Sequence, residues 1–185
     1  VFLQLCEVSR APYQMLARIG GQYILCASPE LFLRKRGDLL FTKPIKGTIR
    51  RGATAADDDR LRETLYNSLK DRTENVMAVD VARNDLSMLA TRGSVEVNKL
   101  YNIESFETVH QMVSTVSCRL RPEIGFTHII NATFPMASMT GAPKFRAMQL
   151  IDEEELGHVF AANFVFHNAY GPDKRWYYNA DLSGG

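Results

Sequence analysis

The spacing of apolar and polar positions along the chain predicts a mixture of strands and helices. Short apolar or alternating runs bounded by turn residues are typical of strands. On these grounds strands are predicted over residues 22–28, 31–35, 39–42, 94–100 and 109–120. The first of them reads as a buried strand. Gly37 and Asp38 separate the second from the third and predict the turn of a hairpin.

One long stretch has the spacing of an amphipathic helix, from about Arg60 to Leu89. Its apolar side begins with leucines four residues apart, at Leu61, Leu65 and Leu69. A polar loop over 51–59 precedes it, and the three aspartates that end the loop suit the positive end of a helix dipole. Further helices are predicted over 127–134 and from Pro143 to about Glu154. Strands and helices alternate irregularly without a repeat or linker, which indicates one α+β domain.

Composition narrows the class of protein. The 185 residues are 45% hydrophobic and 23% charged with a net charge of +1, which is ordinary for one globular domain and predicts no nucleic-acid partner. No apolar run approaches the roughly 18 residues of a membrane span. Three scattered cysteines fit neither a disulfide framework nor a zinc site, so we expect a reducing, cytoplasmic location. The start at Val1, without Met or a charged leader, predicts a piece of a longer protein.

The segment 44–48, Pro-Ile-Lys-Gly-Thr, places a single lysine in a frame that suits a nucleophile. Pro44 restricts the backbone, and Gly47 allows it to come close to a ligand. Apolar Ile45 beside Lys46 disfavours the charged ammonium, which makes the free amine available for attack. A surface lysine at the end of a strand is the alternative, and these five residues alone favour it.

Two groups of charged residues lie on the long predicted helix. In the run 70–75, Glu74 is a candidate oxygen ligand for Mg²⁺, although such runs are usually a solvated helix face. Further along, Asp80, Arg83, Asn84 and Asp85 have spacings that favour a structural hydrogen-bond network over a functional site.

Two other places carry candidate chemistry. His110 lies among apolar residues of a predicted strand, where a lone histidine is more often a core residue than a catalyst. The segment 138–144 puts two hydroxyls and a glycine before Pro143 at the start of a predicted helix, which is typical of a cradle for a carboxylate. An ordinary capped helix start explains the same pattern equally well, and the glycine spacing excludes a Walker loop.

Four segments, taken in order, resemble the chorismate-binding family. They are residues 27–30 (Ala-Ser-Pro-Glu), 44–48, 70–75 together with 80–85, and 138–144 together with 146–148. The resemblance covers roughly residues 1–155 and implies the fold of that family, an α+β fold in which helices flank antiparallel sheets. Within the family, Lys46 resembles the lysine found at this position in the aminodeoxychorismate synthase (para-aminobenzoate) branch. Anthranilate synthases usually have alanine there.

The resemblance also implies roles for single residues. Lys46 would attack ring carbon 2 of chorismate, and ammonia from a glutamine amidotransferase subunit would then enter at carbon 4. Glu30 would act as a general acid, His110 would lie beside the ring, and Glu74 would bind Mg²⁺. The substrate-lining positions would be Gly47, Thr48, Ser138, Met139, Thr140 and Gly141.

The chain also departs from the family. Family domains are much longer, and the downstream motifs, including a second Mg²⁺ glutamate, are not recognisable over residues 157–185. We therefore expect residues 1–156 to be the central part of an incomplete chorismate-binding domain and 157–185 to be a divergent tail of unknown role. Two alternatives stay open: an anthranilate synthase or isochorismate synthase type of enzyme, and a non-catalytic fragment holding part of an active site.

Overall fold

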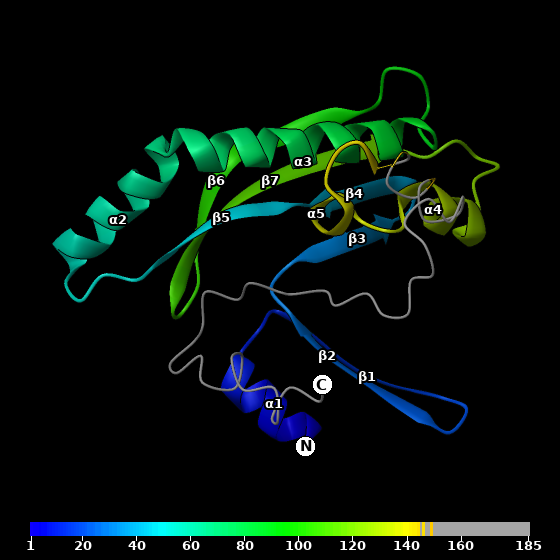
Figure 1. Cartoon of the computed structure of the whole chain (residues 1–185). Coiled ribbons are helices and arrows are strands. Elements are labelled where there is room, and N and C mark those ends of the chain that lie inside the picture. Colours follow the sequence, from blue (N-terminus) through cyan, green and yellow to red (C-terminus); the bar gives the residue numbers. More distant parts are fainter. Residues whose placement is uncertain (145, 147–148, 150–185) are drawn as a thin grey trace.

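The structure is a computed structural model, and it describes residues 1–144, 146 and 149 (Figure 1). The elements follow one another as α1 Phe2–Ser9, β1 Tyr13–Ile19, β2 Gln22–Ser28, β3 Leu31–Arg36, β4 Leu39–Lys43, β5 Ile45–Arg50, α2 Ala55–Asn67, α3 Leu69–Ser87, β6 Glu96–Ser105, β7 Val109–Arg119, α4 Phe126–Thr133 and α5 Ala137–Thr140. The fold class is confirmed as α+β with antiparallel sheets. The helix predicted from Pro143 lies mostly outside the described residues, as does the predicted tail over 157–185.

The main sheet is organised around β7, which is buried along almost its whole length. On one side β7 pairs antiparallel with β6. On the other side it pairs first with β4 and then with β5, which lie end to end along the same edge. Pro44 stands between β4 and β5, and its carbonyl oxygen accepts a hydrogen bond from the Ser114 N–H at 3.1 Å. The strands predicted over 31–35, 39–42, 94–100 and 109–120 are confirmed, with shifted ends.

The helix predicted over 60–89 is in fact two helices, so that prediction is wrong at its centre. Ser68 has an extended backbone and ends α2, while its hydroxyl accepts the Asp71 N–H and caps α3. Leu61 and Leu65 are buried as predicted, but Leu69 is 80% exposed, because the break turns it away from the core. The polar loop is also shorter than predicted, since Thr54 caps α2.

The core lies where α3 packs on the sheet and α4 packs against α3 (Figure 1). Its buried apolar residues include Leu40 of β4, Val79 and Leu86 of α3, Val116 of β7 and Ile129 of α4. This packing fixes α3 against the face of the sheet, and the candidate residues Lys46 and Glu74 come from β5 and α3. In the part of the chain that the structure describes, no helix is long and apolar enough to cross a membrane.

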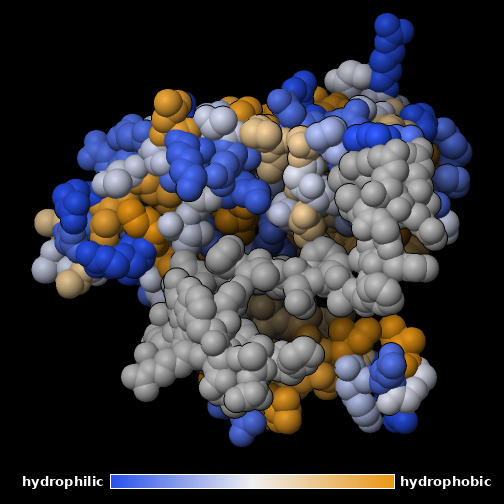
Figure 2. Space-filling model, in the orientation of Figure 1, coloured by the Kyte–Doolittle hydropathy of each residue, from blue (hydrophilic) through white to orange (hydrophobic). Residues whose placement is uncertain are grey.

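The hairpin β1–β2 stands apart from the main sheet (Figure 1). The strand over 22–28 was predicted to be buried, and this is wrong: Tyr23, Ile24 and Leu25 are exposed. Figure 2 shows the apolar side chains gathered on this hairpin. Among the described residues the short helix α1 contacts β2, but one short helix does not cover a two-stranded ribbon, so many of its apolar residues face outward.

Candidate active site

Lys46 and Glu74 line one pocket of about 170 Å³. Lys46 comes from β5 and Glu74 from α3, while Ala137, Gly141 and Ala142 close the pocket from the segment around α5. The remaining wall is apolar and belongs to α3: Met77, Ala78 and Val81. Segments that are distant in the sequence therefore place an amine and a carboxylate around one hollow large enough for part of a small ligand.

A bulge in β5 places Lys46 in this pocket. The pairing of β5 with β7 shifts register between Ile45 and Thr48, so the two residues between them leave the ladder. Gly47 has a φ of +92°, and a Cβ at this position would lie 2.8 Å from the Asp71 Cβ. The site thus needs glycine both for the left-handed backbone and for the close packing of α3. The Lys46 Nζ lies 3.5 Å from the Ser138 carbonyl oxygen, to which it donates.

Glu30 is partly buried next to Lys46, in the turn between β2 and β3. Its Oε1 accepts a hydrogen bond from the Ile45 N–H at 3.0 Å. Burial raises the pKa of the Glu30 carboxyl, while hydrogen bonds from Ile45 and Ser138 and the charge of Lys46 partly offset the rise. A carboxyl group with a raised pKa keeps its proton nearer to neutral pH, as a general acid requires.

Glu74 has the exposure and freedom expected of a metal ligand. Its side chain is 48% exposed, and its nearest ion-pair partner, the Lys70 Nζ, is 4.0 Å away. Within the described residues, no group of three or more His, Cys, Asp or Glu could hold a metal ion. Mg²⁺ often takes only one or two protein carboxylates together with substrate oxygens and water. Glu74 therefore fits as one ligand of such a site.

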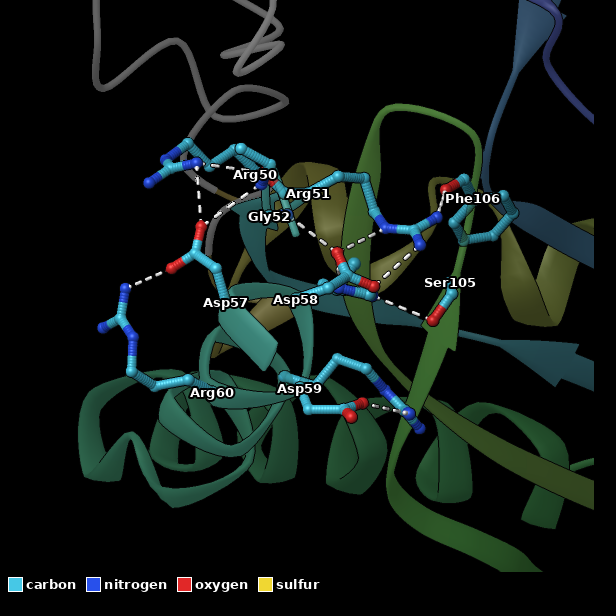
Figure 3. A network of polar contacts seen from close by, with 12 residues as sticks. Arg50, Arg51, Gly52, Asp57, Asp58, Asp59, Arg60, Ser105 and Phe106 are labelled. Carbon is cyan, nitrogen blue, oxygen red and sulfur yellow. Dashed lines mark hydrogen bonds and ion pairs between the residues drawn. The ribbon is translucent and has the colours of Figure 1, made fainter. Parts of the chain in front are cut away.

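His110 is fully buried in β7 and is not among the residues that line the pocket. Its Nε2 lies 3.0 Å from Asp58 Oδ1, and its Nδ1 lies 2.8 Å from Ser105 Oγ. The structure thus does not bring its ring nitrogens to Lys46 or Glu74. The two ring nitrogens of His110 are engaged instead with Asp58 and Ser105, the residues labelled in the polar network of Figure 3.

Asp58 is the centre of that network (Figure 3). Arg51 donates to both of its oxygens, at 2.8 and 2.7 Å, and the Gly52 N–H donates at 2.7 Å. The Arg51 guanidinium and the Gly52 N–H hold the pKa of Asp58 well below its usual range. An ionised carboxylate only accepts hydrogen bonds, so Nε2 of His110 is the protonated nitrogen and donates to Asp58. Local patterns did not reveal this network, although the polar loop prediction included Arg51 and Asp58.

The predicted substrate-lining residues are only partly brought together. Gly141 lines the pocket, and Ser138 offers its carbonyl oxygen to Lys46. Ser138 also belongs to the short helix α5, together with Met139 and Thr140, where an open cradle was expected. Thr48 is exposed and accepts a hydrogen bond from Gln111 at 3.5 Å.

The charged residues on α3 divide into an exposed pair and a buried one. Arg83 donates to Asp80 at 3.0 Å on the surface, as the predicted network required. Asp85 is buried and pairs with Lys144 at 2.9 Å, a contact that the sequence analysis missed. Asn75 was read as part of a charged run but is completely buried, where it donates to the Met112 carbonyl oxygen at 3.1 Å. The sequence feature that could have indicated its burial is the helical spacing, because Asn75 lies one turn before the apolar residues 78 and 79 on the same face of the helix.

Known proteins resemble this chain over most of its length. Residues 1–167 match the sequence model of the chorismate binding enzymes. The chain is 43% identical over 154 residues to aminodeoxychorismate synthase component 1 of Escherichia coli (strain K12), which covers 83% of this chain and 34% of that protein. It is 47% identical over 151 residues to the aminodeoxychorismate synthase of Streptomyces pristinaespiralis, covering 81% and 21%. It is 40% identical over 152 residues to anthranilate synthase component 1 of Aeropyrum pernix, covering 82% and 35%.

Solved structures of chorismate-using enzymes also resemble this chain. Anthranilate synthase component I from Streptococcus pneumoniae superposes with a TM-score of 0.70 at 32% identity, over 82% of this chain and 33% of that one. The menaquinone-specific isochorismate synthase of Escherichia coli shares the fold, with a TM-score of 0.61 at 22% identity over 72% and 30% of the two chains. The chain spans about a third of the length of the E. coli relative. By sequence and by fold, it belongs to the chorismate-binding enzyme family.

Proposed function

We propose that this chain is part of component I of an aminodeoxychorismate synthase. The enzyme would convert chorismate and ammonia to 4-amino-4-deoxychorismate, with ammonia supplied by a glutamine amidotransferase subunit. The observation that carries the proposal is the pocket shared by Lys46 and Glu74. Relatives with this name at 41–47% identity support it. The enzyme would act in folate biosynthesis. It would be located in the cytoplasm and would have no nucleic-acid or membrane partner.

The residues around the pocket suit the steps of this reaction. The free amine of Lys46 attacks carbon 2 of chorismate, and the 4-hydroxyl takes the proton of Glu30 and leaves as water. Ammonia then adds at carbon 4, and Lys46 leaves carbon 2 as an amine. Glu74 would hold Mg²⁺, which when bound neutralises a substrate carboxylate.

The other predicted residues take supporting roles in the proposal. His110 would contribute through its fixed orientation, because Asp58 and Ser105 engage both of its ring nitrogens. Gly47, Thr48 and the segment 138–141 would line the substrate, after α5 adjusts around it. The proposal also keeps residues 1–156 as the central part of the chorismate-binding domain and residues 157–185 as a divergent tail.

The decisive experiment replaces Lys46 in the complete gene product. With chorismate, Mg²⁺ and an ammonium salt, Lys46→Ala should lower the turnover number by about 10³-fold or more, because the nucleophile is lost. Lys43→Ala is the matched control, since Lys43 pairs with Glu104 at 2.6 Å and does not line this pocket. An unchanged turnover number in Lys46→Ala would contradict the proposed mechanism.

Two other readings are separated by the products. Chromatography of the same reaction distinguishes 4-amino-4-deoxychorismate from anthranilate and from isochorismate. The anthranilate alternative is tested because the chain also resembles anthranilate synthase component 1 of Aeropyrum pernix. A non-catalytic fragment is the second alternative, favoured by the fact that the chain spans about a third of the E. coli relative. Such a fragment would give no product with any nitrogen source.

A further inference from the structure

A second group of reactive side chains lies beside the turn of the β6–β7 hairpin. Ser105 is the last residue of β6 and pairs directly with His110 of β7, so the two side chains are neighbours on one face of the sheet. They are in contact, because Ser105 Oγ lies 2.8 Å from His110 Nδ1. Neither residue lines the Lys46 pocket, so this group is separate from the candidate active site.

The other ring nitrogen of His110 contacts an ionised acid. Its Nε2 lies 3.0 Å from Oδ1 of Asp58, a residue in the first turn of α2. Arg51 and the Gly52 N–H donate to this carboxylate and keep it charged, so the proton of the neutral imidazole is on Nε2. Nδ1 then carries the lone pair and accepts the hydroxyl proton of Ser105. Asp58 and Ser105, both labelled in Figure 3, are thus connected through one imidazole ring.

A hydroxyl, an imidazole and a carboxylate in this order activate a serine for attack. The imidazole takes the hydroxyl proton as the serine oxygen forms its new bond, and the carboxylate stabilises the imidazolium that results. Either ring nitrogen can act as the base, provided that the other one carries the proton. Here the base, His110, is completely buried and held at both nitrogens, whereas Ser105 is exposed and can be reached from solvent.

Two other serines show what sets Ser105 apart. Ser87 is also exposed, but its hydroxyl donates to the Asn84 carbonyl oxygen at 2.7 Å, an acceptor that is not a base at neutral pH. Ser114 is completely buried and donates to the side-chain oxygen of Asn75, which is equally unable to take a proton. Ser105 combines an exposed position with a basic acceptor, and a nucleophile needs both.

We propose that Ser105 is the nucleophile of an esterase-type site for small carboxylic esters, with His110 as its base and Asp58 as the residue that orients the base. Ser105 Oγ bonds to the ester carbonyl carbon while its proton passes to His110 Nδ1. The carbon–oxygen bond of the ester then breaks, and the alcohol leaves with that proton. Water next adds to the acyl carbon and gives a proton to Nδ1, which returns it to Ser105 as the acid leaves. The reaction needs neither chorismate nor Mg²⁺, so it is independent of the proposed function.

Labelling of the complete gene product with a fluorophosphonate tests the nucleophile directly. Attack by Ser105 Oγ forms an oxygen–phosphorus bond and expels fluoride, the hydroxyl proton passes to His110, and peptide mass spectrometry locates the adduct. Ser87 is the internal control, because it is an exposed serine without a base. We expect Ser105 to be labelled roughly 10²-fold faster than Ser87 or more, the factor that a general base supplies. Equal rates at the two serines, or no adduct at Ser105, would overturn the proposal.

Turnover is measured with p-nitrophenyl acetate, from the release of nitrophenolate. Ser105→Ala removes an exposed hydroxyl and should keep the fold, and we expect the rate to fall by roughly tenfold or more because the acyl acceptor is lost. Ser87→Ala is the matched control and should keep the parent rate. Equal rates in the two variants would show that Ser105 carries no acyl group and would overturn the proposal.

The roles of His110 and Asp58 are read from the position of the imidazole proton. In long-range ¹H–¹⁵N spectra of the parent near neutral pH, we expect the His110 proton on Nε2 and a free lone pair on Nδ1. Asp58→Asn removes the charged acceptor, so labelling of Ser105 should slow by roughly tenfold or more, whereas Asp59→Asn should leave it unchanged. A proton on Nδ1 in the parent, or unchanged labelling in folded Asp58→Asn, would overturn the assignment of these two residues. The parent spectrum decides the question even where Asp58→Asn does not fold.

Discussion

The side chains of the candidate site differ in how strongly their contacts fix them in place. Glu30 is fixed by a backbone hydrogen bond, and Lys46 reaches a carbonyl oxygen of α5. Glu74, in contrast, is about half exposed, and its ion-pair contact with Lys70 at 4.0 Å is loose. An exposed ion pair of this kind contributes little to stability, so little would be lost if Glu74 left Lys70 to bind Mg²⁺.

Replacement of Glu74 tests its role as a metal ligand. Glu74→Gln keeps the shape but loses the charge, so the Mg²⁺ concentration for half-maximal activity should rise by about tenfold or more. Glu63→Gln, an exposed glutamate on α2, should leave the titration unchanged. If the Mg²⁺ titrations of Glu74→Gln and the parent coincide, Glu74 is no more than a surface residue.

Asp58 makes a prediction about stability and pH. Its pKa in the folded state lies below the unfolded value of about 3.9, so its ionised form stabilises the fold above about pH 4. This contribution is lost as the pH falls toward the folded value. Asp58→Asn should therefore be less stable than the parent at neutral pH, and the difference should shrink in acid.

The measurement is the urea midpoint as a function of pH. Asp59→Asn is the matched control, because the neighbouring Asp59 is 77% exposed and pairs loosely with Arg62 at 3.6 Å. Parallel curves for Asp58→Asn and the parent would mean that ionisation of Asp58 does not stabilise the folded state, and coincident curves would mean that the Arg51–Asp58–His110 network does not stabilise it at all.

At the scale of elements, the start of α2 is pressed against the loop before it. A Cβ at Gly52 would lie 2.2 Å from the Asp58 backbone nitrogen, so there is no space for a side chain. Gly52→Ala must separate the loop from the helix and disturb the Asp58 network. We expect a loss of about 2–4 kcal/mol in the free energy of unfolding.

Gly21→Ala is the comparison for this variant. A Cβ at Gly21 would meet no atom within 4 Å, so urea unfolding should show a loss below about 1 kcal/mol. Equal losses for Gly21→Ala and Gly52→Ala would contradict the close packing of loop and helix.

At the scale of the whole molecule, the described residues hold only part of what catalysis would need. They supply one candidate metal carboxylate, Glu74, and the chain spans about a third of the E. coli relative. Positioning and charge stabilisation usually account for most of an enzyme's rate enhancement. We therefore expect the 185-residue chain by itself to show no measurable turnover of chorismate.

This is checked with purified chain, chorismate, Mg²⁺ and a high concentration of ammonium salt, which removes the need for a glutaminase. Circular dichroism on the same sample shows whether the chain is folded. Product formation by the purified chain at a robust rate would contradict the prediction.

The sequence by itself determined the features that depend on neighbouring residues. The hairpin at Gly37, the strand β7 and the resemblance of the 44–48 and 70–75 segments to a known family could all be read locally. The fold class and the family were predicted correctly for this reason, because strand alternation, turn chemistry and motifs are short-range signals.

Only the tertiary structure decided what lies next to what. It divided the long helix at Ser68, exposed β2, and joined His110 to Asp58 across 52 positions of sequence. It also placed Asp85 against Lys144 and opened one pocket to both Lys46 and Glu74. Burial and hydrogen-bond partners depend on which elements pack together, and the periodicity of a single element carries no record of its partners.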